Sequence, residues 1–133
     1  MNALLLDTNV VSVLFNRNHR LRDSCIRAVS GHELAISFMS RAELLLWPAV
    51  NRWGDPRRTT LLRHLSLYTT LYPDELTCSI WSSIVADCRR AGRPVQTADA
   101  WIAALAQQWR LPLVTADIGD FEGIPEIEIV PIR

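Results

Sequence analysis

The stretch Ala3-Leu4-Leu5-Leu6-Asp7-Thr8-Asn9 places an acid, a hydroxyl and an amide directly behind a short apolar run. A continuous apolar run of this length is typical of a strand that is buried on both faces, as in a parallel sheet. Asn9 is a favourable N-cap for a helix over the amphipathic residues 10–15. The stretch therefore predicts that Asp7 stands between a strand and a helix, at the sheet edge where open α/β proteins bind ligands.

The rest of the chain alternates short apolar runs with segments of helical periodicity, joined by short turns. Further strands are predicted over residues 34–38, 67–72, 113–115 and 127–132. Helices are predicted over residues 21–29, 57–67, 74–91 and 97–109, and over a segment that opens at Ser40 and is kinked or ended by Pro48. This order predicts one domain over residues 1–133, a three-layer α/β/α sandwich around a parallel sheet of four to five strands.

Composition limits the class of protein. The 133 residues are 49% hydrophobic, which excludes a disordered chain, and no apolar run reaches the length of a membrane span. Three cysteines without CxxC spacing favour a reduced, cytoplasmic protein. The charge is balanced, with 14 acidic and 14 basic residues, yet every basic residue is Arg and none is Lys. Codon usage explains such a bias as well as a preference for phosphate ligands does.

Five acids follow an apolar strand directly or lie in the first helical turn after one: Asp7, Glu43, Asp99, Asp117 and Asp120. Each alone has an ordinary structural explanation. Glu43 is spaced to form a capping box with the Ser at position 40, Asp99 complements a helix dipole, and the others suit turns. The hypothesis of a functional site therefore depends on whether the five acids gather.

Two of these acids share a helix face with apolar residues. Asp99 stands three, four and seven positions before apolar residues of its helix. Glu43 has the same relation to Leu46, Trp47 and Val50. These stripes are predicted to face the sheet, where a charge needs a partner or a metal, and the chain has no Lys. A cluster of oxygen ligands without His or Cys favours Mg²⁺ or Mn²⁺, and such ions bind phosphates and orient attacking water.

Four segments together resemble the PIN-domain family, and most closely its VapC-type toxins. They are LLLDTN at residues 4–9, SRAELL at 40–45, TADAWIAALA at 97–106 and VTADIGDF at 114–121. The resemblance spans the chain in order. It implies a parallel α/β/α fold and a Mg²⁺-dependent endoribonuclease, with Mn²⁺ as a possible substitute, that cleaves phosphodiester bonds with metal-activated water. It also implies a homodimer and a cognate VapB-like antitoxin.

The resemblance assigns roles by position. Asp7, Glu43, Asp99 and Asp117 match the catalytic, metal-binding acids of the family. Asp120 matches the second acid of the last motif, so either of the last two acids is a candidate ligand, for one metal ion or two. The residues that would orient carboxylates or metal-bound waters are Thr8, Asn9 and Thr115.

Four arginines, Arg17, Arg20, Arg22 and Arg93, lie in segments expected to border the acidic edge and to bind RNA phosphates. Solvated surface is the ordinary alternative for each of them. We therefore carry RNA binding by these side chains as a hypothesis.

Other functions are open at this stage. A degenerate PIN-like domain would bind RNA without cleaving it. Haloacid-dehalogenase-type phosphatases and response-regulator receivers also place an Asp after the first strand, but both need a Lys. The phosphatases further need an Asp where this chain has Asn9, so both phosphoryl-transfer alternatives are disfavoured.

Overall fold

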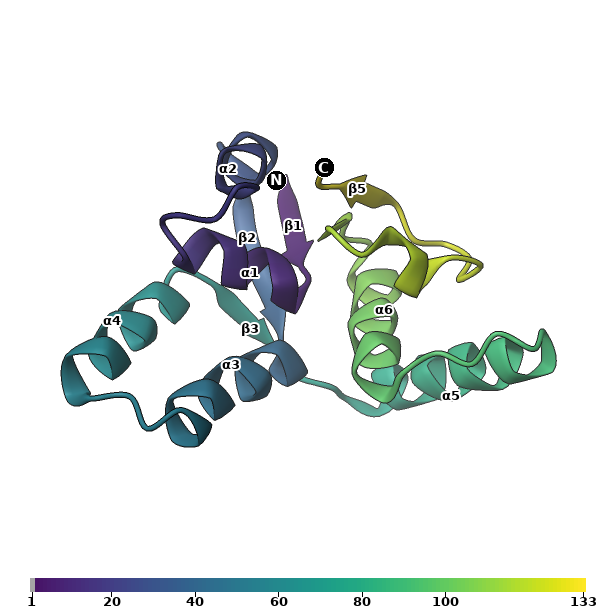
Figure 1. The fold of residues 1–133 in the computed structure, drawn as a ribbon. Coiled ribbons are helices and arrows are strands. Elements are labelled where there is room, and N and C mark those ends of the chain that lie inside the picture. The colour runs from purple at the N-terminus through teal and green to yellow at the C-terminus, as the bar shows by residue number, and fades with distance from the viewer. Residues whose placement is uncertain (1) are drawn as a thin grey trace.

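Five parallel strands form one sheet in the order β3-β2-β1-β4-β5 in the computed structural model, which describes residues 2–133 (Figure 1). The strands are β1 Ala3–Leu6, β2 Glu33–Ser37, β3 Thr69–Leu71, β4 Leu113–Thr115 and β5 Ile129–Pro131. The first strand lies at the centre, and β5 is at an edge as predicted. The predicted fold class, with its central parallel sheet, is therefore confirmed.

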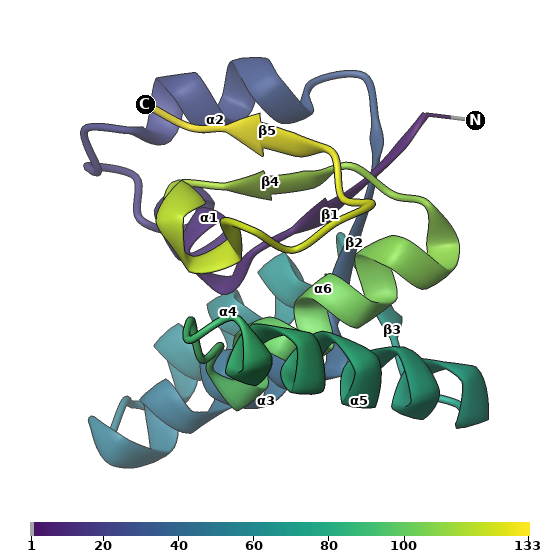
Figure 2. The ribbon, with the colours of Figure 1, turned by 90° about the vertical axis from the view of Figure 1, so that its right-hand side faces the viewer.

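Helices cover both faces of this sheet (Figure 2). They are α1 Thr8–Phe15, α2 Arg22–Val29, α3 Phe38–Val50, α4 Asp55–Leu65, α5 Glu75–Arg90 and α6 Thr97–Trp109, with a short 3-10 helix η1 at Ile118–Phe121. Helices α5 and α6 pack together on one face, and α1 to α4 pack mainly on the other. No helix within residues 2–133 combines the length and the apolar character needed to cross a membrane.

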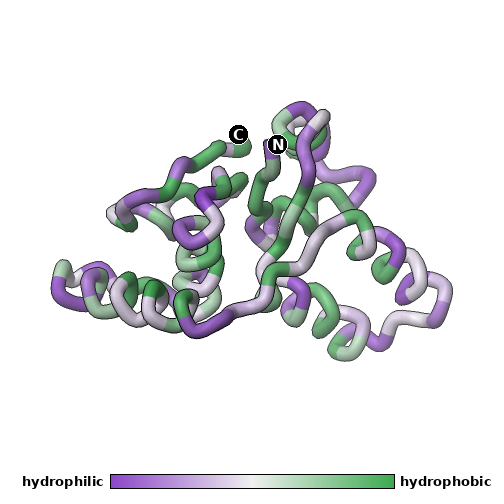
Figure 3. The backbone as a smooth tube through the Cα atoms, turned by 180° about the vertical axis from the view of Figure 1, so that it is seen from behind, coloured by the Kyte–Doolittle hydropathy of each residue, from purple (hydrophilic) through white to green (hydrophobic). Residues whose placement is uncertain are grey.

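The alternation of side chains along β1 divides the core in two. Leu4 and Leu6 point into the cluster formed with α1, α2 and α4, whereas Leu5 points into the cluster formed with α5 and α6. All three are at most 5% exposed. A central strand of a two-sided parallel sheet must be apolar on both faces, and Figure 3 shows the hydrophobic residues gathered on the central strands. Residues 3–6 therefore form the buried strand that their composition predicts.

The start of α1 differs from the prediction. Asp7, not Asn9, is the N-cap, with an extended backbone (φ −66°, ψ 155°), and its carboxylate accepts a hydrogen bond from the Thr8 backbone N–H at 2.7 Å. Asp and Asn are about equally favourable at the N-cap, so cap propensity does not distinguish Asp7 from Asn9. The strand ends at Leu6, and the first polar residue after it takes the capping position. Asn9 consequently lies inside the helix, where its side chain is available to the site.

The start of α3 also differs. Ser37 is its N-cap, and the Ser37 hydroxyl accepts a hydrogen bond from the Ser40 backbone N–H at 3.0 Å. The predicted capping box of Ser40 and Glu43 is therefore wrong, because the helix begins at Phe38 and contains both residues. The predicted strand over residues 34–38 runs one residue too far, because Phe38 extends the apolar run of β2 although it is the first residue of α3.

The remainder of α3 corrects two further expectations. The helix continues through Pro48 to Val50, so Pro48 does not end it. Leu46 is 56% exposed and Val50 66% exposed, so the stripe predicted to face the sheet with Glu43 faces solvent, apart from the half-buried Trp47. The helix contacts the core through Leu44 and its neighbours, and periodicity alone does not say which side of a helix is covered.

Candidate functional site

A pocket of about 280 Å³ opens at the carboxyl ends of β1 and β4, and we call it the acidic pocket. It is lined by all five acids singled out in the sequence, together with Thr8, Asn9, Ser12 and Trp47. The strands deliver two of the acids, because β1 pairs with β4 and the register matches Leu6 to Val114. Helices α3 and α6 and the turn η1 deliver the others. The fold thus gathers carboxylates that are up to 113 residues apart in the chain.

Asp7 is the most enclosed of these acids, with 5% of its surface exposed. One carboxylate oxygen accepts from the Thr8 N–H, and the other accepts from the Thr115 hydroxyl at 2.7 Å. Burial raises the pKa of Asp7, the two hydrogen bonds oppose that rise, and the nearby Asp117 and Asp120 carboxylates add to it. Asp7 is therefore held in a fixed orientation at the floor of the pocket.

A chain of hydroxyl groups positions Glu43. The Thr8 hydroxyl donates to the Glu43 carboxylate at 3.1 Å and lies 2.7 Å from the Ser40 hydroxyl. The Ser37 hydroxyl in turn donates to Ser40 at 3.2 Å, and both serines are fully buried. The sequence analysis missed Ser37 and gave Ser40 only a capping role. The signal that could have found them is a pair of hydroxyls at the carboxyl end of a strand beside the central one.

Asn9 and Thr115 orient the opposite wall. The Asn9 side-chain amide donates to the Asp117 carboxylate at 2.7 Å, and the Thr115 hydroxyl accepts from the Asp117 backbone N–H at 3.0 Å. Within residues 2–133, the Asn9 carbonyl oxygen is a buried polar atom that has no hydrogen-bond partner. A buried acceptor without a donor is costly, and a cation or a cation-bound water would satisfy it.

Asp99 is the acid with the most perturbed protonation. It lies in the first turn of α6 on the same face as the buried Ile102, Ala103 and Ala106, as predicted. Its pKa is raised to about 7, first by burial and then by repulsion from the carboxylates of Asp7, Asp120, Glu43 and Asp117. This repulsion arises only because the five acids share one small volume.

The donors of the acidic pocket suit a hard divalent cation. They are carboxylate, amide and hydroxyl oxygens, and no His or Cys lines the pocket. Among residues 2–133, no group of three or more His, Cys, Asp and Glu side chains is arranged to hold a metal ion as it stands. Mg²⁺ does not need such a cage, because it usually keeps several waters and takes one or two carboxylates from the protein. The residues therefore fit Mg²⁺ by their chemistry and leave room for its waters.

None of the four arginines predicted to bind RNA lines the acidic pocket. Arg17 and Arg20 are exposed, and Arg17 lines a second hollow beside the acidic pocket. Arg22 is half-buried. Its side chain donates a hydrogen bond to the Leu14 carbonyl, near the C-terminal end of α1, at 3.3 Å. RNA binding by these side chains stays a prediction.

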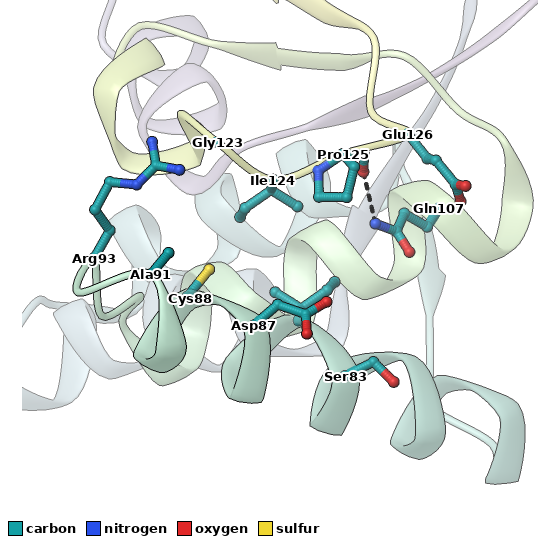
Figure 4. A pocket seen from close by; sticks show the side chains of 11 residues that line it. Ser83, Asp87, Cys88, Ala91, Arg93, Gln107, Gly123, Ile124, Pro125 and Glu126 are labelled. Carbon is teal, nitrogen blue, oxygen red and sulfur yellow. Dashed lines mark hydrogen bonds between the residues drawn. The ribbon is translucent and has the colours of Figure 1, made fainter.

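Arg93 lies at a different cavity, of about 250 Å³, between α5, α6 and the segment 123–126 (Figure 4). Its guanidinium packs against the backbone of Gly123, whose φ of +82° suits glycine. On the other side, the Gln107 amide donates to the Pro125 carbonyl at 2.7 Å. The five acids are absent from this cavity, so it is separate from the acidic pocket.

The chain is similar to known proteins along most of its length. Residues 4–126 match the PIN domain family. The "Plasmid stability protein StbB" of Pseudomonas syringae pv. tomato is 35% identical over 128 residues, covering 90% of this chain and 91% of the relative. The "Ribonuclease VapC1" of Haemophilus influenzae (strain R2866) is 26% identical over 129 residues, covering 93% of each chain.

Two solved structures have the same fold along nearly the whole chain. The crystal structure of FitAcB from Neisseria gonorrhoeae matches with a TM-score of 0.82 and 26% identity, covering 96% of this chain and 97% of that one. A structure of VapBC2 from Rickettsia felis, bound to a DNA fragment from its promoter, matches with a TM-score of 0.85, covering 98% of this chain and 99% of that one. At 19% identity the second similarity concerns the fold alone.

Proposed function

Because this chain belongs to the PIN domain family, we propose that it is a divalent-metal-dependent endoribonuclease and the toxin of a VapBC-like toxin–antitoxin pair. The observation that carries the proposal is the acidic pocket, in which four other carboxylates lie near a half-buried Asp99 whose pKa is raised to about 7. A relative named as a VapC ribonuclease supports the substrate class. The family also leaves the receiver and phosphatase alternatives without support.

The side chains of the pocket would divide the work. We assign Asp7 and Asp99 as the principal ligands of Mg²⁺ or Mn²⁺. Asp7 is held in place by hydrogen bonds, and the pKa of Asp99 is raised by burial and by the neighbouring carboxylates, whose repulsion a cation would relieve. Glu43, Asp117 and Asp120 line the same pocket and would accept hydrogen bonds from waters on the cation. When bound, the cation would supply an activated water and would neutralise charge on the phosphate.

The residues between the acids would preserve this arrangement. Thr8 bridges the two sides of the pocket, because its backbone N–H donates to Asp7 and its hydroxyl donates to Glu43. Thr115 connects Asp7 to the backbone of Asp117 in the same way. Removing either hydroxyl should misplace carboxylates that are otherwise intact, and such orientation is worth 10- to 100-fold in affinity for a metal at comparable sites.

The direct test is cleavage of total RNA by the purified protein with Mg²⁺ or Mn²⁺. We expect products with a 5′-phosphate and a 3′-hydroxyl, and EDTA should abolish the activity. Asp99→Asn should abolish it too, whereas Asp23→Asn, which changes an exposed acid in the first turn of α2, should not. Cleavage that persists in chelator, or that leaves cyclic phosphate ends, would contradict the proposal. Metal-independent RNA binding without cleavage would instead favour the degenerate binding module.

The antitoxin proposal rests on the comparisons alone. Several similar solved structures are toxin–antitoxin complexes, so we propose a VapB-like antitoxin as the inhibitor of this chain. Its gene is expected beside this one, and its purified product should suppress RNA cleavage at a stoichiometric ratio. We also propose, from the family resemblance, that the protein is cytoplasmic and forms a homodimer, and light scattering on the purified protein would test the dimer. A monomeric protein that still cleaves RNA would remove the dimer from the proposal and leave the activity standing.

A further inference from the structure

A second hollow, of about 560 Å³, adjoins the acidic pocket. Its lining residues come from α1, α3 and the start of α4 with the turn before it, and Figure 1 shows how these helices are arranged. We call it the aromatic hollow, and its principal lining residues are Phe15, Trp47, Trp53, Arg17 and Arg57. Ser12 and Trp47 line both cavities, so the two are adjacent. Ser12 stands five positions after Asp7, the N-cap of α1, which is a rise of roughly 7.5 Å along the helix. A strand whose phosphate lies at the acids can therefore place a neighbouring nucleotide in the aromatic hollow.

The hollow presents planar groups that are already stacked. The rings of Phe15 and Trp53 lie 6.1 Å apart at 15°, and the Arg57 guanidinium lies 3.7 Å from the centre of the Trp53 ring. The three aromatic residues pack partly against the core, which accounts for their buried edges. Core packing does not explain the position of Arg57, because its side chain is exposed to solvent while its guanidinium covers the Trp53 ring.

The charge of the hollow is of one sign. No acid lines it, whereas Arg17 and Arg57 do, and both are exposed. The single ion pair found within residues 2–133 joins Arg90 to Asp87, so neither arginine of the hollow has a carboxylate partner there. Stacked planes beside unpaired guanidinium groups suit an occupant that has a flat ring and a negative charge, which describes a nucleotide.

We infer that the aromatic hollow is a subsite for one unpaired nucleotide of the substrate. Its base stacks against the aromatic and guanidinium planes, and its phosphate contacts Arg17 and Arg57. The inference rests on the proposed function only in taking RNA as the substrate. It has a consequence for specificity, because a base held in a duplex cannot enter the hollow, and the enzyme should therefore select single-stranded RNA.

The test measures binding of a mixed-sequence pool of eight-nucleotide RNA in the presence of Mg²⁺. All proteins carry Asp99→Asn, so that cleavage does not interfere. Trp53→Ala should weaken binding by roughly tenfold or more, as expected for the loss of one stacked base, and Trp53→Tyr should restore most of it. The matched control is Trp109→Ala, which removes a 54%-exposed tryptophan at the end of α6 and should change nothing.

A second pair of variants avoids any doubt about folding. Arg57→Ala removes an exposed side chain of the hollow, and Arg58→Ala removes its exposed neighbour, which lies outside the hollow. Arg57→Ala should weaken binding and reduce the slope of log K against log salt by about one, and Arg58→Ala should do neither. Equal effects of the two substitutions, or RNA binding that is indifferent to both Trp53 and Arg57, would overturn the inference and leave the hollow to a protein segment.

Failure of this inference is distinguishable from failure of the proposed function. In the otherwise wild-type protein, Trp53→Ala should raise KM for single-stranded RNA by about tenfold and leave kcat within a few-fold. An active enzyme with an unchanged KM sinks the subsite alone. A protein without cleavage activity whose RNA binding still depends on Trp53 and Arg57 sinks the proposed activity and supports the subsite.

Discussion

Replacing Asp99 by Asn should stabilise the metal-free protein at alkaline pH. If its carboxyl were wholly shielded from water, a pKa raised from 3.8 to about 7 would cost about 4 kcal/mol of folding free energy above pH 7. Because Asp99 is only half-buried, solvent screening reduces this to about 1–2 kcal/mol. Loss of its favourable interaction with the α6 dipole offsets about 0.3–1 kcal/mol. A net gain of about 1 kcal/mol therefore remains for the Asn variant at pH 8.

The pH dependence of folding stability follows from the raised pKa of Asp99. A carboxyl whose folded-state pKa is raised contributes stability below its unfolded pKa and loses it as pH rises through the folded value. Wild type should therefore lose stability between pH 4 and pH 7, and the Asn variant should lose less. The advantage of the variant should shrink as the pH falls from 8 to 5.

Urea unfolding in EDTA at pH 8 and pH 5 is the assay, with Asp23→Asn as the control for the helix-dipole contribution. That control should be slightly less stable than wild type at pH 8. An Asp99→Asn protein that is also less stable at pH 8, or whose difference from wild type is the same at both pH values, would refute the electrostatic account of the acidic pocket. Mn²⁺ at 100 times its dissociation constant should add about 2.7 kcal/mol to wild type and distinctly less to the variant at the same concentration.

Three further predictions concern stability and RNA binding. Thr115→Val should destabilise the protein by about 1–3 kcal/mol in urea unfolding, because it leaves one oxygen of the buried Asp7 carboxylate and the Asp117 backbone N–H without a partner; no loss would show that water replaces the hydroxyl. Gly123→Ala should lower stability by about 1–2 kcal/mol because of its φ of +82°, whereas Gly119→Ala, with open space around it, should not; equal thermal melts would contradict this. Arg20→Ala should flatten the salt dependence of RNA binding, while Arg22→Ala should mainly destabilise the protein by removing a hydrogen bond to the end of α1; salt titrations and melts separate the two outcomes.

The amino-acid sequence by itself determined the class of fold and the gathering of the acids. The apolar run before Asp7 has no polar face, so only a strand covered on both sides can bury it. Helix α6 runs over the predicted residues because its periodicity and Pro112 mark its limits, and this periodicity placed Asp99 on the buried face. Since parallel strands end at one edge of a sheet, Asp7 and Asp117, which follow the adjacent strands β1 and β4, lie together there, and Glu43 and Asp99 reach the same edge from helices α3 and α6.

Only the tertiary structure decided which of several equivalent local choices is used. Asp7 and Ser37 cap their helices in place of Asn9 and Ser40 because the ends of the strands, and not cap propensity, set where each helix begins. The exposure of Leu46 was undetermined for a similar reason, since the covered side of α3 depends on how the other helices pack. The aromatic hollow has no signature in the sequence either. Phe15 lies at the end of α1, Trp47 lies in α3 and Trp53 lies in the turn before α4, and their rings line one hollow because these segments pack around it. Side chains that are distant in sequence acquire a common environment only through such packing.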